Sequence, residues 1–158
     1  MDKVIVGIAE GKTISDGHVL VSYALGSCVG ICLYDAGKKL AGMAHIVLPD
    51  SENGVDQKNP YKYASTGITA LIHEMEVKGA RKERMTAKIA GGANMFQGSG
   101  GKWEIGKQNI ASVKRALEAV KIPVIAEDTG KNYGRTIVFS AENGSLEINT
   151  VRREKKVI

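Results

Sequence analysis

The sequence predicts an α+β fold, a mostly antiparallel β-sandwich-like sheet with two main helices packed on it, in a single domain spanning residues 1–158. Two observations lead to this prediction. Runs of apolar and β-branched residues bounded by turn residues dominate both ends of the chain. Two segments with apolar residues at helical spacing lie in its middle. The order of four strands, helix, strand, helix and three strands is unlike the strict alternation of a doubly wound parallel sheet.

The first third of the chain reads as strands. Asp16-Gly17 is a turn signal between the first two runs, and Asp35-Ala36-Gly37 lies between the next two. The expected strands cover residues 4–9, 18–23, 29–34 and 40–48.

The helices are expected in the middle of the chain. Asn59 is a suitable N-cap for a helix with Pro60 at its first position, and Gly79 is a suitable stop. A second apolar stripe, from Ile110 to Val120, ends before Pro123. The remaining strands are expected at residues 85–90, 124–127, 135–140 and 146–151.

Composition narrows the function classes. The net charge is +5, with 43% hydrophobic and 25% charged residues, which is ordinary for a soluble globular domain. Basic stripes interleaved with aromatics and zinc-knuckle spacing are absent, so nucleic-acid binding is not expected. No apolar run is long enough to span a bilayer, and no signal peptide is evident. With two cysteines only four residues apart, the sequence favours a reducing, cytoplasmic setting.

No cofactor is expected from the motifs. Cys28 and Cys32 could supply two metal ligands, but no second Cys or His pair completes a zinc site. The glycine-rich segment 91–101 lacks the glycine spacing of a phosphate-binding loop, and Trp103 follows Lys102 where such a loop has Ser or Thr. A loop beside a site, or a plain surface loop, is the better interpretation.

Cys28 and His45 are the candidate catalytic pair. If Ala36-Gly37 forms a two-residue hairpin loop, Cys28 lies directly opposite His45, where a thiol and an imidazole can share a proton. A four-residue loop leaves both side chains on the same face with an offset of one step, whereas a three-residue loop breaks the alignment. The glycines at 26 and 30 allow a tight backbone at the cysteine.

A structural explanation of the same residues stands beside the catalytic one. Free cysteine usually behaves as a small buried hydrophobe, and a histidine in an apolar strand is more often a core residue than a catalyst. Ser22, six residues before Cys28, offers a hydroxyl that could orient the imidazole. Cys32 is most simply a core residue.

Five segments together resemble the CheD family of chemoreceptor glutamine deamidases. They are LGSCV at 25–29, GMAHIVLP at 42–49, KIAGGANMF at 88–96, IGKQN at 105–109, and EDTG followed by Gly134-Arg135 at 127–135. The resemblance covers nearly the whole chain, and the combination is specific although no single segment is.

The resemblance implies a cytoplasmic chemotaxis enzyme that hydrolyses selected glutamine side chains of methyl-accepting chemoreceptors to glutamate. The family uses a cysteine, a histidine and a threonine, which map onto Cys28, His45 and Ser22. Ser22 departs from the family threonine, and Lys131 stands where the family tends to have a second glycine. The family fold resembles a bacterial deamidating toxin domain.

The resemblance also implies a CheC-type phosphatase as a partner. One alternative is therefore a non-catalytic regulatory binding module that acts through CheC, with Cys28 structural. Another is a protease or transamidase that uses the same Cys-His pair.

Overall fold

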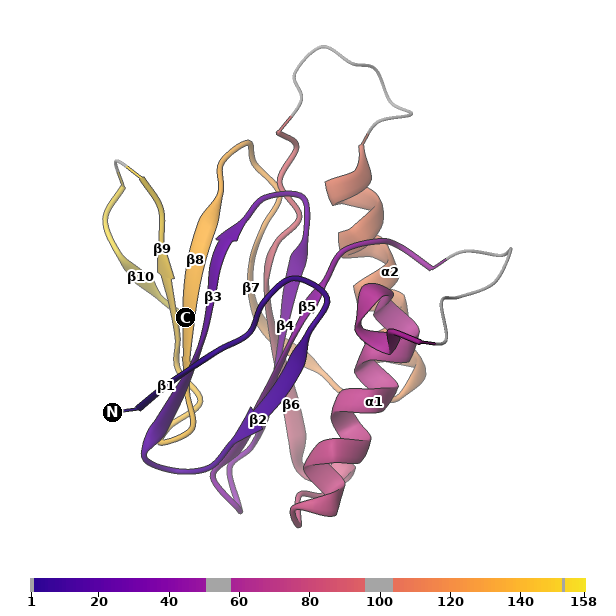
Figure 1. The fold of residues 1–158 in the computed structure, drawn as a ribbon, viewed down its shortest axis with the longest axis vertical. Coiled ribbons are helices and arrows are strands. Elements are labelled where there is room, and N and C mark those ends of the chain that lie inside the picture. Colours follow the sequence, from indigo (N-terminus) through magenta and orange to yellow (C-terminus); the bar gives the residue numbers. More distant parts are fainter. Residues whose placement is uncertain (1, 51–57, 96–103, 152) are drawn as a thin grey trace.

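Two five-stranded sheets lie face to face, and two helices cover the outer face of one of them (Figure 1). The computed structural model describes residues 2–50, 58–95, 104–151 and 153–158. In this three-layer arrangement the second sheet is buried on both sides, by the first sheet and by the helices. The predicted α+β architecture is confirmed.

The first sheet, called sheet A, has the order β1-β3-β8-β9-β10. β1 is parallel to β3, and the other neighbours are antiparallel. Its strands are β1 (Asp2–Ile5), β3 (His18–Leu25), β8 (Arg135–Ser140), β9 (Leu146–Asn149) and β10 (Lys156–Val157).

The second sheet, called sheet B, has the order β2-β5-β4-β6-β7 and is antiparallel except between β6 and β7. Its strands are β2 (Gly11–Ile14), β4 (Val29–Asp35), β5 (Leu40–Ile46), β6 (Met85–Gly91) and β7 (Val124–Thr129). The helices are α1 (Ala64–Val77) and α2 (Ile105–Ala119), with short 3-10 helices at η1 (Pro60–Lys62) and η2 (Lys82–Arg84).

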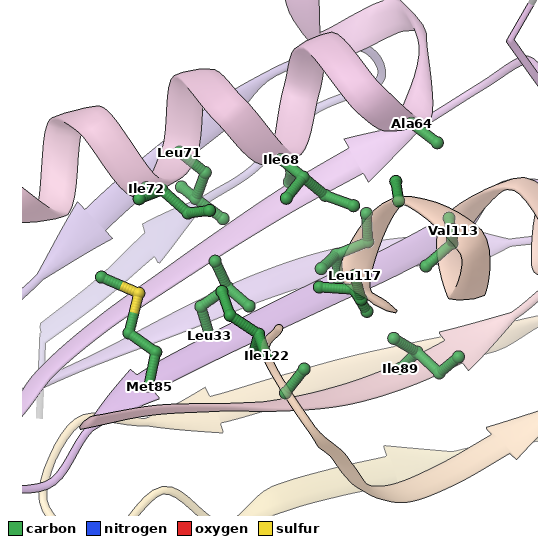
Figure 2. Packing of buried hydrophobic residues seen from close by; sticks show 14 of the residues in the cluster. Leu33, Ala64, Ile68, Leu71, Ile72, Met85, Ile89, Val113, Leu117 and Ile122 are labelled. Atoms are coloured by element: carbon green, nitrogen blue, oxygen red, sulfur yellow. The ribbon is translucent and has the colours of Figure 1, made fainter. Parts of the chain in front are cut away.

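Side chains of the central strand β4 alternate between two cores because successive residues of a strand point to opposite faces. Leu33 and its alternate neighbours pack against the helices, where Figure 2 shows it near Leu117 and Ile122. Cys32 instead belongs to the core between the two sheets, together with Met43 of β5 and other side chains. The inter-sheet layer is the one in which the candidate site lies.

The first turns of the chain depart from the sequence-based expectation. The strand expected at 4–9 ends at Ile5, because residues 7–10 form a turn in which the Glu10 N–H donates to the Gly7 carbonyl over 3.1 Å. Ala9 there has a left-handed backbone, with φ of 58°, and Ile8 is exposed. The strands β2 and β10 were not expected.

Of the loop lengths considered for the hairpin between β4 and β5, the structure has the four-residue loop, not the two-residue loop at Ala36-Gly37. Asp35 pairs with Leu40, and Gly30 pairs with His45. The Asp35 carboxylate stabilises the wider turn, since it accepts from the Gly37 N–H at 2.9 Å and from the Arg84 side chain. This is the offset register, which keeps Cys28 and His45 on one face.

Both helices lie where the sequence patterns predict them, except that α1 begins later than expected. Asn59 caps η1 rather than α1, accepting from the Tyr61 N–H at 3.2 Å, and α1 begins at Ala64. Gly79 adopts a positive φ of 104° after α1, as a helix-terminating glycine does. Part of the expected loop after Pro49 and part of the glycine-rich segment 91–101 lie outside the described residues.

Candidate functional site

Ser22 and His45 meet between the two sheets. Ser22 lies on β3 of sheet A and is completely buried, while His45 lies on β5 of sheet B and is 3% exposed. The Ser22 Oγ is 2.8 Å from the His45 Nδ1. The predicted contact between this hydroxyl and the imidazole is therefore present.

A third atom determines the direction of this hydrogen bond. The Ser22 Oγ is also 2.8 Å from the Val6 carbonyl oxygen, to which it donates. A hydroxyl has one hydrogen and a carbonyl oxygen only accepts, so the Ser22 Oγ must accept from a protonated His45 Nδ1. In the neutral ring this leaves the Nε2 of His45 with a lone pair that can accept a proton.

The backbone on either side of His45 is held by the turn at residues 7–10. The His45 N–H donates to the Glu10 carbonyl at 2.9 Å, and the Ala9 N–H donates to the His45 carbonyl at 3.0 Å. Val6, which accepts from Ser22, directly precedes this turn. The same short segment thus fixes both the strand that carries the histidine and the hydroxyl that orients its ring.

Cys28 lies in the turn between β3 and β4 and is partly exposed. Gly30, two residues later, pairs with His45, so Cys28 comes diagonally across from His45 on the inter-sheet face. Diagonal neighbours have Cα atoms roughly 7–8 Å apart, with their Cβ atoms closer. The register therefore allows a thiol-imidazole pair at the rim of the inter-sheet layer.

The carbonyl groups of the cysteine turn, residues 26–28, are all bonded to donors from other segments. The Gly26 carbonyl accepts from the Ala93 N–H at 2.9 Å, and the Cys28 carbonyl accepts from the Gly92 N–H at 2.8 Å. Asn109 of α2 donates its Nδ2 to the Ser27 carbonyl at 3.0 Å. The turn is consequently held at three successive positions.

Gly91 allows the close approach of β6 to this turn. A Cβ at position 91 would lie 2.3 Å from the Cys28 carbonyl oxygen, and the backbone there has a φ of 108°. Both observations exclude a larger residue without local rearrangement. The start of the glycine-rich segment thus supports the cysteine turn.

The titration of the pair is set mainly by burial. Burial lowers the pKa of His45, and the charge of Glu10 together with the Val6 carbonyl partly offsets this. Burial raises the pKa of the Cys28 thiol, against a smaller opposing effect of its own backbone N–H. Both directions favour the uncharged form of each group at neutral pH, a thiol at Cys28 and a neutral imidazole at His45.

Cys32 is a core residue in the structure, as the sequence suggested. It is completely buried between the sheets, and burial raises the pKa of its thiol. Among the residues that the structure describes, no group of three His, Cys, Asp or Glu side chains is placed to hold a metal ion.

Comparison with known proteins identifies the family. A sequence profile described as "CheD chemotactic sensory transduction" matches residues 47–150. The chain is 47% identical over 152 residues to the "Probable chemoreceptor glutamine deamidase CheD" of Clostridium novyi, covering 95% of this chain and 94% of that one. The chain belongs to the CheD family.

Other CheD relatives span the chain almost completely. The "Probable chemoreceptor glutamine deamidase CheD" of Moorella thermoacetica is 46% identical, covering 99% of this chain and 95% of its own length. The "Chemoreceptor glutamine deamidase CheD" of Halalkalibacterium halodurans is 44% identical, with 99% of each chain covered. These alignments extend over the segments that carry Ser22, Cys28 and His45, which precede the part matched by the family profile.

The structure accounts for one departure from the CheD pattern. Lys131 has a left-handed backbone with φ of 62°, a conformation that glycine adopts without strain. Its carbonyl accepts from the Asn94 N–H at 2.8 Å. The glycine that the family resemblance led us to expect at this position would adopt the same backbone without strain.

Sequence reasoning missed the groups that hold the cysteine turn. Asn109 and the backbone of residues 91–93 were noted only as parts of the family segments, without a role. Their contacts with residues 26–28 join positions more than sixty residues apart, and no local periodicity could indicate this.

Proposed function

We propose that this CheD protein hydrolyses glutamine side chains of chemoreceptors to glutamate, with Cys28 as the nucleophile and His45 as the base. The names of the similar proteins from Clostridium novyi and Halalkalibacterium halodurans support the substrate class. The observation that carries the mechanism is the position of the Ser22 Oγ between the Val6 carbonyl and the His45 Nδ1. That arrangement leaves the Nε2 of His45 as the proton acceptor.

The reaction proceeds in two stages. The His45 Nε2 takes the proton of the Cys28 thiol, and the sulfur attacks the carboxamide carbon of the receptor glutamine. The imidazolium returns the proton to the departing nitrogen, so ammonia leaves and a thioester remains on Cys28. Water, deprotonated by the same imidazole, then hydrolyses the thioester and yields glutamate and the free thiol.

The backbone N–H groups of Ser27 and Cys28 are the proposed donors to the oxyanion. The carbonyls of residues 26–28 accept from the N–H groups of Gly92 and Ala93 and from the Asn109 side chain. No other described residue accepts a hydrogen bond from the N–H groups of Ser27 and Cys28. They remain as the polar backbone groups that can meet substrate. In comparable acyl-transfer sites one such donor contributes about 3–4 kcal/mol to transition-state stabilisation.

The experiment is deamidation of a chemoreceptor cytoplasmic fragment, followed by mass spectrometry and ammonia release. Each converted glutamine adds about one dalton to its peptide. Cys28→Ala is expected to abolish conversion while the protein still melts cooperatively, since it removes one partly exposed sulfur. Cys32→Ser is the matched control and is expected to retain most activity, at a stability cost of about 1–3 kcal/mol for a hydroxyl in the core.

Wild-type conversion by the Cys28→Ala variant would overturn the mechanism. Cleavage of the receptor backbone or incorporation of an added amine would instead identify a protease or a transamidase. Stimulation of a CheC-type phosphatase by Cys28→Ala as well as by the wild type, without ammonia release from either, would identify a regulatory binding module.

The family resemblance also supports a CheC-type phosphatase as a binding partner and the cytoplasm as the compartment. No helix in the described parts of the chain is long and apolar enough to cross a membrane. Pull-down of a CheC protein by the purified chain, with a CheC-unrelated protein as the control, tests the partner.

A further inference from the structure

The side-chain amide of Asn109 joins the two segments that carry the proposed catalytic pair. Its Nδ2 donates to the Ser27 carbonyl at 3.0 Å and to the Val47 carbonyl at 2.9 Å. Ser27 directly precedes Cys28, and Val47 follows His45 by two residues. Both hydrogens of one NH₂ group are therefore used to bridge the cysteine turn and the end of the histidine strand.

The cysteine turn and Val47 are not joined to each other by the hydrogen bonds of the β4–β5 pairing. The pairing of β4 with β5 ends at Val29 and Ile46, so the cysteine turn and Val47 both lie beyond the last paired residues. Two chain segments that leave a ladder are free to separate unless another group ties them together. Asn109, on a helix packed against sheet B, supplies that connection.

An asparagine at position 109 is not explained by the stability of the fold, because burying this side chain carries a free-energy cost. Asn109 is completely buried in α2, and its Oδ1 accepts no hydrogen bond within the described part of the chain. A buried polar atom without a partner costs about 1–3 kcal/mol. Val113 and Leu117, one and two turns later in α2, are buried apolar residues, whereas Ser112 is a second buried polar residue whose hydroxyl has a hydrogen-bond partner. An asparagine here is explained by its two donated hydrogen bonds rather than by packing.

We propose that Asn109 is a positioning residue, which sets the separation between Cys28 and His45 by clamping the Ser27 and Val47 carbonyls. This inference rests on the proposed function for its kinetic consequence, although the clamp itself is a matter of geometry. Small displacements matter at such a site, since a misplacement of about 1 Å can lower a rate roughly 100-fold. Because Asn109 is completely buried and cannot contact the receptor, we expect substrate binding to change little when it is replaced.

The test compares Asn109→Ala with Ser112→Ala. Ser112 is the matched control because it is a buried polar residue on the same helix, one turn later, and its Oγ contacts the Asp50 N–H rather than the cysteine turn. Deamidation of a chemoreceptor fragment is measured below the melting temperature of every variant. Asn109→Ala is expected to lower kcat by about 10- to 100-fold with KM within about threefold of the wild type, and Ser112→Ala to leave both nearly unchanged.

A second readout does not require the receptor substrate. The rate of iodoacetamide alkylation at Cys28, located by peptide mass spectrometry, reports how well His45 assists loss of the thiol proton. At neutral pH, Asn109→Ala is expected to slow alkylation to the rate of His45→Ala. Adding Asn109→Ala to His45→Ala is expected to cause no further change, because the clamp acts through the pair.

A lowered melting temperature with turnover and alkylation rates within twofold of the wild type would overturn the proposal and leave Asn109 purely structural. A full additional loss in the double variant would overturn it as well. If the wild type releases no ammonia from receptor while Asn109→Ala still slows alkylation, the proposed function fails and the positioning role of Asn109 stands.

Discussion

Replacement of Ser22 by alanine isolates the step that orients the histidine. In the variant the His45 Nδ1–H loses its acceptor, and the Val6 carbonyl loses its donor. Both groups are buried, so the ring gains by moving its proton to Nε2 or by rotating toward another partner. The first change removes the Nε2 lone pair that accepts the Cys28 proton, and the second turns that lone pair away from the thiol.

The size of the effect follows from the lost hydrogen bond. An unsatisfied buried group costs about 1–3 kcal/mol, and a bias of about 1–2 kcal/mol against the productive tautomer lowers its population roughly 5- to 30-fold. We therefore expect Ser22→Ala to reduce kcat roughly 5- to 30-fold. KM is expected to change little, because the hydroxyl is completely buried and acts on the imidazole. Ser22→Thr retains the hydroxyl and restricts its rotamers, so turnover is expected to be preserved or improved.

Two measurements check this reasoning. Steady-state kinetics on a chemoreceptor fragment give kcat and KM for the Ala, Ser and Thr forms, with Ser140→Ala as a control on the neighbouring strand β8, three residue pairs away from Ser22. The ¹⁵N chemical shifts of His45 report which ring nitrogen carries the proton, independently of any substrate. Equal turnover in the three forms, or a His45 protonated at Nε2 in the wild type, would remove Ser22 from the site and leave a Cys28-His45 dyad.

Three further predictions concern the surroundings of the site. Gly91→Ala is expected to lower turnover at least tenfold and to destabilise the fold. The reason is that its Cβ would lie 2.3 Å from the Cys28 carbonyl oxygen and that the backbone φ at this position is positive. Wild-type activity and melting temperature in this variant would contradict the close approach of β6 to the cysteine turn. Lys131→Gly is expected to raise the free energy of unfolding by up to about 1 kcal/mol without changing turnover, since the backbone of Lys131 is left-handed. Chemical denaturation measures this free energy, and a loss of stability would refute the argument from backbone strain. Burial lowers the pKa of His45, so kcat/KM is expected to stay constant as the pH is lowered through the ordinary histidine range. It should fall only below that range, where the imidazole becomes protonated. A pH–rate profile whose acid limb lies above that range would contradict this prediction. The same shift makes the contribution of His45 to stability complete above the unfolded-state pKa and progressively lost as the pH falls below it.

The features that the sequence could predict are those with a local period. Runs of apolar and β-branched residues between turn residues indicated the central strands, and helical spacing indicated both helices. The common face of Cys28 and His45 was predictable although the loop length was left open, because a strand has a period of two and the two-residue and four-residue loops differ by an even shift. The hydrogen bond of Asp35 to Gly37 and its ion pair with Arg84, forty-nine residues away, favour the longer loop, and only the first of these is local.

The features beyond the reach of the sequence are those made by contacts between distant segments. The local sequence does not indicate that β1 pairs in parallel with β3, or that β6 pairs in parallel with β7. The sequence of a strand does not by itself identify the strand with which it pairs. The division of the strands into two sheets is equally non-local, yet it determines the chemistry: Ser22 reaches His45 because their strands belong to opposite sheets and face the same layer.

The proposed site therefore combines a nucleophile from the turn between the two sheets, a base from sheet B, an orienting hydroxyl from sheet A and a clamp from a helix on the outer face. His45 is fixed by Ser22 of β3 and by the turn at residues 7–10. The cysteine turn is fixed by α2 and the end of β6. Asn109 contacts both halves, since it bonds Ser27 on one side and Val47 on the other. Substitutions at Ser22 and at Asn109 should then impair the same proton transfer by different routes, one through the tautomer of the ring and one through its distance from the thiol. The ¹⁵N spectrum of His45 separates them, because Ser22→Ala alters the protonated nitrogen whereas Asn109→Ala leaves it at Nδ1.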